Sequence, residues 1–251
     1  MQIKAAGLTH IGMKRGHNED SFFIMQEENL FVVADGMGGH ASGEIASQMA
    51  VETVANFFKA TSNDDEVTWP FKMDREHDYQ ENRLSTGMKL GNLRIYEAAQ
   101  REVRYRGMGT TMVSALFSDG DVIIGHVGDS RAYLIRNGEI RQITEDHSLL
   151  NDYIKARKLT AEEIENFPHK NVIVRALGMK DSIAVDINRL SPEAGDVYLL
   201  CTDGLSGMVK DADMAQIVAA NPIENAVGEL IKAANENGGN DNITVILIKA
   251  E

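Results

Sequence analysis

Acidic residues at the ends of apolar segments are the part of this sequence most suited to chemistry. Asp35 follows the apolar run LFVVA, Asp203 follows VYLLCT, and Asp241 directly precedes NITVILI. The other acids in such places are Glu19, Asp20 and Asp129. One such acid alone is most simply a turn or cap residue, because Asp-Gly is a common turn dipeptide. Several at one rim of a sheet would form an anionic cluster that stays ionised only with a bound cation, and an all-oxygen donor set suits Mg²⁺ or Mn²⁺.

The elements that would position these acids are short strands. Runs rich in Val, Ile, Leu and Phe and bounded by Gly, Asp and Asn predict strands. They cover residues 21–25, 30–35, 110–117, 121–128, 131–135, 139–144, 196–203 and 242–248. Asn137-Gly138 between two of them predicts a type I′ hairpin turn, and the short polar loop at 26–29 predicts another hairpin. Hairpins imply antiparallel sheets.

Helices are predicted between the strand runs. Apolar residues recur at helical spacing over 43–59 and from 81 to about 104. A third helix is predicted after Asn221, with Asn221 as its N-cap and Pro222 as its first residue. Helices grouped between hairpins indicate an α+β fold in which the helices cover sheet faces.

Two segments are less regular. Residues 63–80 are predicted to form a loop, and 147–179 a helical insert between strands. Within the insert, Thr160 and Glu163 match a capping-box pattern. Inserts of this kind often lie over a functional site.

The composition narrows the class of protein. The chain has 251 residues, of which 43% are hydrophobic, and a net charge of −13. That charge argues against nucleic acid or an anionic membrane as the main partner. The single cysteine, Cys201, lies in an apolar run, which predicts a buried thiol rather than a nucleophile or a disulfide. No apolar stretch reaches the about 18 residues of a membrane span, and the first residues do not form a signal peptide, so we expect a cytoplasmic protein.

Eight short motifs occur in a fixed order along the chain. They are RGHNED (15–20), VVADGMGGHASGE (32–44), GMGTT (107–111), GHVGDSRAY (125–133), EDHSLL (145–150), VIVRALG (172–178), LLCTDGL (199–205) and NGGNDNITVILI (237–248). Any one of them would be weak evidence. Together they closely resemble the bacterial type-2C (PPM family) metal-dependent Ser/Thr protein phosphatases, and they span nearly the whole chain.

The resemblance implies a fold and a domain organisation. The fold would be a four-layer α-β-β-α sandwich, in which two central antiparallel sheets are flanked by pairs of antiparallel helices. This agrees with the α+β order of the predicted elements. A single phosphatase domain would cover 1–251, with a small flap subdomain at about 147–179 beside the site. We expect a free-standing catalytic domain that acts as a monomer.

The resemblance also implies a metal centre with two Mn²⁺ or Mg²⁺ ions at one end of the sandwich. Asp35 would bridge the two ions, and Asp203 and Asp241 would complete the protein ligands of the first. The backbone carbonyl of Gly36 would bind the second ion, with Glu19 nearby, directly or through water.

Two further residues receive roles from the resemblance. Asp20 would support the metal ligands. Arg15 would hold the substrate phosphate; the alternative from the residues alone is a surface salt bridge. A hydroxide bridging the two ions would attack phosphorus in line, so no nucleophilic cysteine is expected.

The chain departs from the family pattern at two positions. The eukaryotic branch has a histidine directly after Asp-Gly as its proposed general acid, whereas this chain has Met37, as most bacterial members do. His40 could assist, although a structural hydrogen bond is the simpler role. Many bacterial members also carry an aspartate shortly before Gly-Thr-Thr that helps to bind a third ion. Gly107 stands there, so a third ion would rest on Asp203 and water.

The function implied is hydrolysis of phosphoserine and phosphothreonine on proteins, opposing a bacterial Ser/Thr kinase. Two alternatives stay open. A regulatory pseudophosphatase would bind partners without catalysis, but such proteins lose metal-binding aspartates that this chain retains. A phosphoesterase acting on small phosphates would share the same chemistry.

Overall fold

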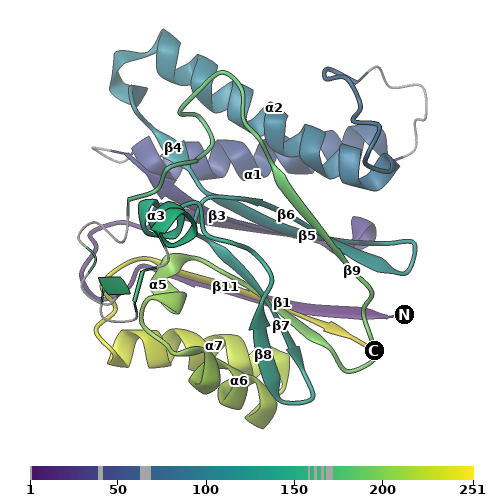
Figure 1. The fold of residues 1–251 in the computed structure, drawn as a ribbon, viewed down its shortest axis with the longest axis vertical. Coiled ribbons are helices and arrows are strands. Elements are labelled where there is room, and N and C mark those ends of the chain that lie inside the picture. The colour runs from purple at the N-terminus through teal and green to yellow at the C-terminus, as the bar shows by residue number, and fades with distance from the viewer. Residues whose placement is uncertain are drawn as a thin grey trace.

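The computed structural model describes residues 2–38, 42–62, 69–157, 159–160, 163–164, 167 and 172–251. Two antiparallel sheets pack face to face, and helices cover both outer faces (Figure 1). The four layers confirm the predicted α+β sandwich. None of the described helices is both long enough and apolar enough to cross a membrane.

The first sheet contains both ends of the chain. Its strands, in spatial order, are β1 (Ile3–His10), β11 (Ile243–Ala250), β10 (Val197–Cys201), β7 (Arg131–Arg136) and β8 (Glu139–Gln142). Beyond the β1–β11 ladder, Gln2 and Glu251 exchange two backbone hydrogen bonds of 2.9 and 2.8 Å. The N- and C-termini therefore lie side by side at one end of the sandwich (Figure 1).

The second sheet contains the strand that carries Asp35. Its order is β2 (Asp20–Met25), β3 (Leu30–Met37), β5 (Met112–Ser118), β6 (Asp121–Val127) and β9 (Asp186–Leu190), and the short β4 (Gly109–Thr110) pairs with the end of β3. Successive side chains of β3 face opposite sides: Leu30 and Val32 pack under helices, whereas Phe31 and Val33 pack between the sheets. Because both faces are buried, this strand appears in the sequence as a continuous apolar run.

The helices form the two outer layers. Helices α1 (Ser42–Thr61) and α2 (Tyr79–Arg101) cover the second sheet, and α6 (Asp211–Ala220) and α7 (Ile223–Glu236) cover the first. Short elements complete the described chain: 3-10 turns η1 (Gln26–Glu28) and η2 (Val103–Tyr105), α3 (Leu149–Arg157) and α5 (Asp203–Ser206).

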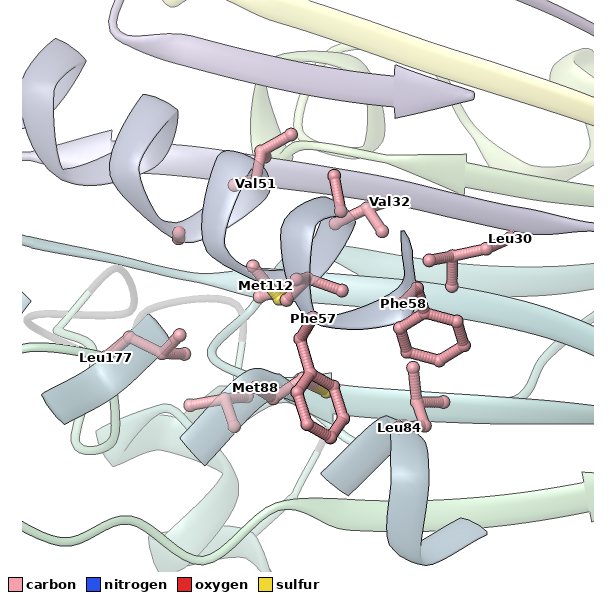
Figure 2. Packing of buried hydrophobic residues seen from close by; sticks show 14 of the residues in the cluster. Leu30, Val32, Val51, Phe57, Phe58, Leu84, Met88, Met112 and Leu177 are labelled. Carbon is pink, nitrogen blue, oxygen red and sulfur yellow. The ribbon is translucent and has the colours of Figure 1, made fainter. Parts of the chain in front are cut away.

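Apolar side chains from α1, α2 and the second sheet form one core cluster, shown in Figure 2. Phe57 and Phe58 of α1 meet Leu84 and Met88 of α2 beneath β3 and β5. This interdigitation holds the C-terminal part of α1 against α2 and the second sheet. The start of α1 meets the end of β3 at Gly43, whose carbonyl lies against Gly36.

The hairpins and most of the helix boundaries agree with the sequence. Asn137 and Gly138 both have positive φ, 54° and 81°, which is the conformation of a type I′ turn. Asn29, also left-handed with φ 49°, completes the β2–β3 hairpin after η1. Thr160 and Glu163 form the two predicted capping-box hydrogen bonds of 2.8 and 3.3 Å.

The prediction of Asn221 as an N-cap is wrong. Asn221 is the C-cap of α6, and its side-chain amide donates to the carbonyl of Ile217 at 2.9 Å. Pro222 is the N-cap of α7. A helix ends where the pattern indicated a helix start, because asparagine serves both ends and α6 itself was not predicted.

Candidate metal centre

The acids at strand ends meet at the end of the sandwich where α5 lies (Figure 1). Asp20 and Asp35 are directly opposite each other in the β2–β3 ladder, so their side chains share one face. Asp203 begins α5 and is separated from the end of β10 by Thr202; Asp241 is separated by Asn242 from the start of β11, the neighbour of β10. Asp129 follows β6. The five carboxylates interact electrostatically, and the side chains of Asp35 and Asp203 are within hydrogen-bonding reach.

Asp20 is held from behind by two threonines. Its Oδ2 accepts hydrogen bonds from the hydroxyls of Thr244 at 2.6 Å and Thr202 at 3.0 Å. Its Oδ1 is buried and has no hydrogen-bond partner in the part of the chain that the structure describes. The threonines at β10 and β11 thus fix one oxygen of Asp20, and the other oxygen stays available.

Burial and mutual repulsion make ionisation of the cluster costly. Burial raises the pKa of Asp35 well above its usual range, and the charges of Asp20 and Asp203 add to the effect. Burial and the charge of Asp241 raise the pKa of Asp203. Burial chiefly raises the pKa of Asp20 and of Asp129 to about 7 in each case. Ionised acids in this position need a nearby cation.

The donor set fits a hard cation. Besides Asp20 Oδ1, the buried oxygens Asp129 Oδ1 and Asp203 Oδ1 have no hydrogen-bond partner in the described structure. Unpartnered buried oxygens are rare in native proteins and call for an explanation. Buried carboxylate oxygens of this kind suit Mg²⁺ or Mn²⁺ as ligands.

The predicted ligands are only partly assembled. No three His, Cys, Asp or Glu side chains among the described residues are already placed to hold one ion. Asp35 and Asp203 are together, but both oxygens of Asp241 are engaged. Asp241 Oδ2 accepts from Arg15 Nη2 at 2.7 Å, and Oδ1 accepts from the backbone N–H of Asn242 at 2.8 Å. The salt bridge that was the alternative role of Arg15 is therefore present, and its partner is a predicted metal ligand.

Gly36 lies where the end of β3 meets two other backbones. A Cβ on Gly36 would lie 2.1 Å from the carbonyl oxygen of Gly43 and 2.5 Å from that of Glu19. Real Cβ atoms do not approach so closely, so only glycine fits. The same contact brings Glu19 beside Asp35, since the N–H of Gly36 donates to the Glu19 carbonyl at 3.1 Å.

A cavity of about 370 Å³ opens beside the cluster. Its lining includes the three acids Asp129, Asp203 and Asp241, and also Arg131 and Ser148. Arg131 makes a bidentate ion pair with Asp146, at 2.9 and 2.7 Å. This arginine therefore adds positive potential near Asp203 while its own charge is already paired.

Sequence reasoning gave Asp129 no role, although it noted the acid at a strand end. The structure places Asp129 beside Asp203, and these two would be the carboxylates for a third ion. Gly107 is not at such a place: it has φ of 80°, and a Cβ there would meet nothing within 4 Å. The motif HVGDSR contained the signal, because it repeats the arrangement of an acid after an apolar strand.

The remaining residues of the motifs have structural surroundings or lie outside the described residues. His126 and His147 are buried and stack with ring centroids 4.6 Å apart. Burial raises the pKa of the Cys201 thiol to about 12, as expected of an unreactive cysteine. Met37 ends β3 opposite Gly109. His40 lies outside the described residues.

Comparison with known proteins decides the family. A sequence profile of protein phosphatase 2C matches residues 6–247. The chain belongs to this family. Protein phosphatase PhpP of Streptococcus pneumoniae is 38% identical over 246 residues, covering 96% of this chain and 95% of PhpP.

Solved structures of protein phosphatase 2C relatives share the fold. Serine/threonine phosphatase Stp1 from Staphylococcus aureus superimposes with a TM-score of 0.87 at 33% identity, covering 100% of this chain and 96% of Stp1. The catalytic domain of the serine/threonine protein phosphatase PstP, at 31% identity and a TM-score of 0.83 over 99% of both chains, was solved in complex with two manganese ions. The predicted dependence of this protein phosphatase 2C member on Mn²⁺ or Mg²⁺ is thereby confirmed at the level of the family.

Proposed function

We propose that this chain hydrolyses phosphoserine and phosphothreonine on proteins at a two-cation centre. The observation that carries the proposal is the cluster of buried, unpartnered carboxylate oxygens at the mouth of a cavity, in a chain of the protein phosphatase 2C family. The side chains of Asp35, Asp203 and Asp241 and the carbonyl of Gly36 would hold the ions, with Glu19 beside them.

The chemistry that the two cations supply is Lewis acidity toward water and toward the phosphoryl oxygens. The chain's own residues provide the geometry for it. Asp20, fixed by its two threonine hydroxyls, holds the backbone beside Asp35 in register. A cation on Asp241 would neutralise the partner of Arg15.

Arg15 is the group suited to bind the substrate phosphate. Its side chain is about half exposed and reaches the cluster by its contact with Asp241. A guanidinium fork matches two phosphoryl oxygens and offsets charge that grows in the transition state. Met37 carries no exchangeable proton, so protonation of the leaving alkoxide does not come from that position.

The insert at 147–179 is proposed as a flap beside the cavity. Ser148 and Leu150 line the cavity with Asp203. An isolated bridge between Ser148 and Ile173 closes the base of the insert. The Arg131–Asp146 ion pair ties that base to β7. The flap would therefore contact the protein part of a substrate.

The biological setting is proposed from the family. The substrates would be targets of a bacterial Ser/Thr kinase, or the kinase itself. The chain would act as a monomer in the cytoplasm.

The test is hydrolysis of an aryl phosphate and of phosphopeptides with Mn²⁺, with Mg²⁺ and with a chelator. We expect activity with either ion, loss of activity with chelator, and a preference for phosphothreonine over phosphotyrosine peptide. Activity that survives chelation would contradict the metal mechanism. A strong phosphotyrosine preference would contradict the substrate class, and turnover of small phosphates alone would favour a general phosphoesterase.

A further inference from the structure

Asn242 connects two loops of the candidate site through its side-chain amide. Its Oδ1 accepts the backbone N–H of Glu19 at 2.8 Å. Its Nδ2 donates to the carbonyls of Ile11 at 2.9 Å and His17 at 3.0 Å. Only 4% of the residue is exposed. All three hydrogen bonds reach the loop of residues 11–19, here called the Arg15 loop, at its beginning and at its end.

The backbone of Asn242 is equally engaged. Its N–H donates to Asp241 Oδ1 at 2.8 Å, while Asp241 Oδ2 accepts from Arg15 at 2.7 Å. Its carbonyl lies against the start of α5, because a Cβ on Gly204 would be 1.9 Å from that oxygen. Asn242 therefore touches the segments that carry Asp203, Asp241 and Arg15.

The Arg15 loop also meets this side of the site through the Arg15–Asp241 ion pair and through two backbone contacts. Met13 N–H donates to the Gly239 carbonyl at 2.7 Å, and the backbone of Gly12 packs against the Asp241 carbonyl. Both contacts lie at the beginning of the loop. The second half, which includes Glu19, is fixed to the Asp241 segment by the Asn242 amide.

We propose that Asn242 is a positioning residue that sets the distance between Arg15 and Glu19 on one side and Asp203 and Asp241 on the other. The inference rests on the proposed function, since it assigns Arg15 to phosphate and the acids to cations. An amide is required because it provides one acceptor and two donors at the same place. An aspartate would keep the acceptor, lose both donors, and bring a carboxylate oxygen against the carbonyls of Ile11 and His17.

Asn82 offers a matched control far from the site. It is 5% exposed; its Oδ1 accepts the N–H of Asp74 at 2.7 Å, and its Nδ2 donates to the carbonyls of Asp74, His77 and Asp78 at 2.8–2.9 Å. It lies in the first turn of α2, whereas the last turn of α2 leads through η2 to β4 beside Asp35. None of its hydrogen-bond partners, which lie at residues 74–78, is a residue of the candidate site. Asn82→Asp makes the same chemical change as Asn242→Asp, at a side-chain amide that likewise hydrogen-bonds to the backbone of a loop.

The experiment measures Mn²⁺ affinity by calorimetry, and KM and kcat with an aryl phosphate, for wild type, Asn242→Asp and Asn82→Asp. We expect Asn242→Asp to weaken Mn²⁺ binding and to raise KM by at least about tenfold each, as for residues that orient metal ligands. We expect Asn82→Asp to lower the melting temperature while Mn²⁺ affinity and KM stay at the wild-type values. Equal losses of melting temperature in the two variants, with unchanged Mn²⁺ affinity and KM in both, would overturn the inference.

Asn242→Ala provides a second variant, because it removes all three side-chain hydrogen bonds without adding a charge. It should reproduce the Mn²⁺ and KM effects if Asn242→Asp does not fold. If neither variant folds, Asn242 is a requirement of the fold and the positioning role is rejected. An inactive wild type that still binds Mn²⁺, with weaker binding in Asn242→Asp, would contradict the proposed function while the positioning of the cation ligands still held.

Discussion

Asp196 and Asp203 stand at the two ends of the same strand, β10, and have opposite surroundings. Asp196 directly precedes the strand, is buried, and receives two hydrogen bonds from Arg136 at 2.7 and 2.6 Å. Burial alone would raise the pKa of Asp196, but these bonds outweigh it and the pKa is lowered. Asp203 follows the strand, has an unpartnered oxygen, and has a raised pKa caused by burial and by Asp241.

The same contrast extends to the neighbouring acids. Asp121 and Asp78 share Arg189, and the pKa of each is lowered. Among the described residues, Asp20 and Asp129 form no ion pair with a basic side chain, and their pKa values are raised. Acids that hold the fold together are paired with arginine. The unpaired acids repel one another when ionised, and a bound cation would relieve this repulsion. Such local conflicts are expected at functional sites.

The largest expected effect is a difference in catalytic activity between substitutions at the two ends of β10. Asp203→Asn should lower kcat/KM with Mn²⁺ by more than about 100-fold, because even residues behind metal ligands cost 10–100-fold. Asp196→Asn should keep wild-type kinetics. Steady-state hydrolysis of an aryl phosphate measures both, and full activity in Asp203→Asn would remove the distinction.

Cation binding should stabilise the fold through the unpaired acids only. Mn²⁺ at a fixed concentration of about 100 times the wild-type Kd should raise the free energy of unfolding of the wild-type protein by about 2.7 kcal/mol. Urea unfolding with and without Mn²⁺ measures this increment. It should shrink in Asp203→Asn and persist in Asp196→Asn; an equal increment in both variants would place the ion elsewhere.

The unpaired acids should determine whether the free energy of unfolding rises or falls with pH. In the cation-free protein, Asp20 and Asp129 hold their protons to about pH 7, whereas in the unfolded chain they release them near 3.8. The folded state therefore binds more protons between these values, and the free energy of unfolding falls as pH rises from about 4 to about 7.

Acids with lowered pKa, such as Asp196, act in the opposite direction, but only below their ordinary value of 3.8. From pH 5 to 7 the expected loss from these two acids together is on the order of 4 kcal/mol, and saturating Mn²⁺ should abolish it. Urea unfolding at pH 5, 6 and 7 provides the measurement. A cation-free protein that gains stability over this range would contradict the assigned burial of the cluster.

The smallest expected effects are changes in melting temperature when no cation is bound. Asp196→Asn should lower the melting temperature by a few degrees, because it removes the buried carboxylate that pairs with Arg136 and leaves the exposed Glu193 as its remaining acidic partner. Asp203→Asn should leave the melting temperature unchanged or raise it, because it removes a repelling charge. Calorimetric melting in chelator compares the two, and a greater loss in Asp203→Asn would reverse the comparison.

The sequence predicted those elements whose own residues show a clear strand or helix pattern. Strands β3, β10 and β11 are buried on both faces over most of their length and are rich in apolar residues. Strand β1 was not predicted: its residues, IKAAGLTH, are half exposed and form a strand because they pair with β11. Strand β9 is an edge strand whose partner β6 lies far away in sequence. Edge strands depend on their neighbours more than on their composition.

The site was predictable to the same degree. Asp35 and Asp203 were assigned from motifs, and the structure brings them together. The role of Asn242 was not accessible, because its partner Glu19 is 223 positions away and an asparagine in a glycine-rich segment resembles an ordinary turn residue. The contact of Arg15 with Asp241 spans 226 positions and was likewise invisible.

The β1–β11 ladder runs from the carboxylate cluster to the chain ends. Its register begins at His10 and Ile243, beside the metal cluster, and ends at Ile3 and Ala250. Eight residues of strand, about 26 Å, therefore separate the site from both chain ends. A short linker could join Gln2 to Glu251 and new ends could be opened in the Asn137-Gly138 turn, giving a circular permutant with an intact cluster. For the same reason, a reporter domain attached at either end would leave the cavity open.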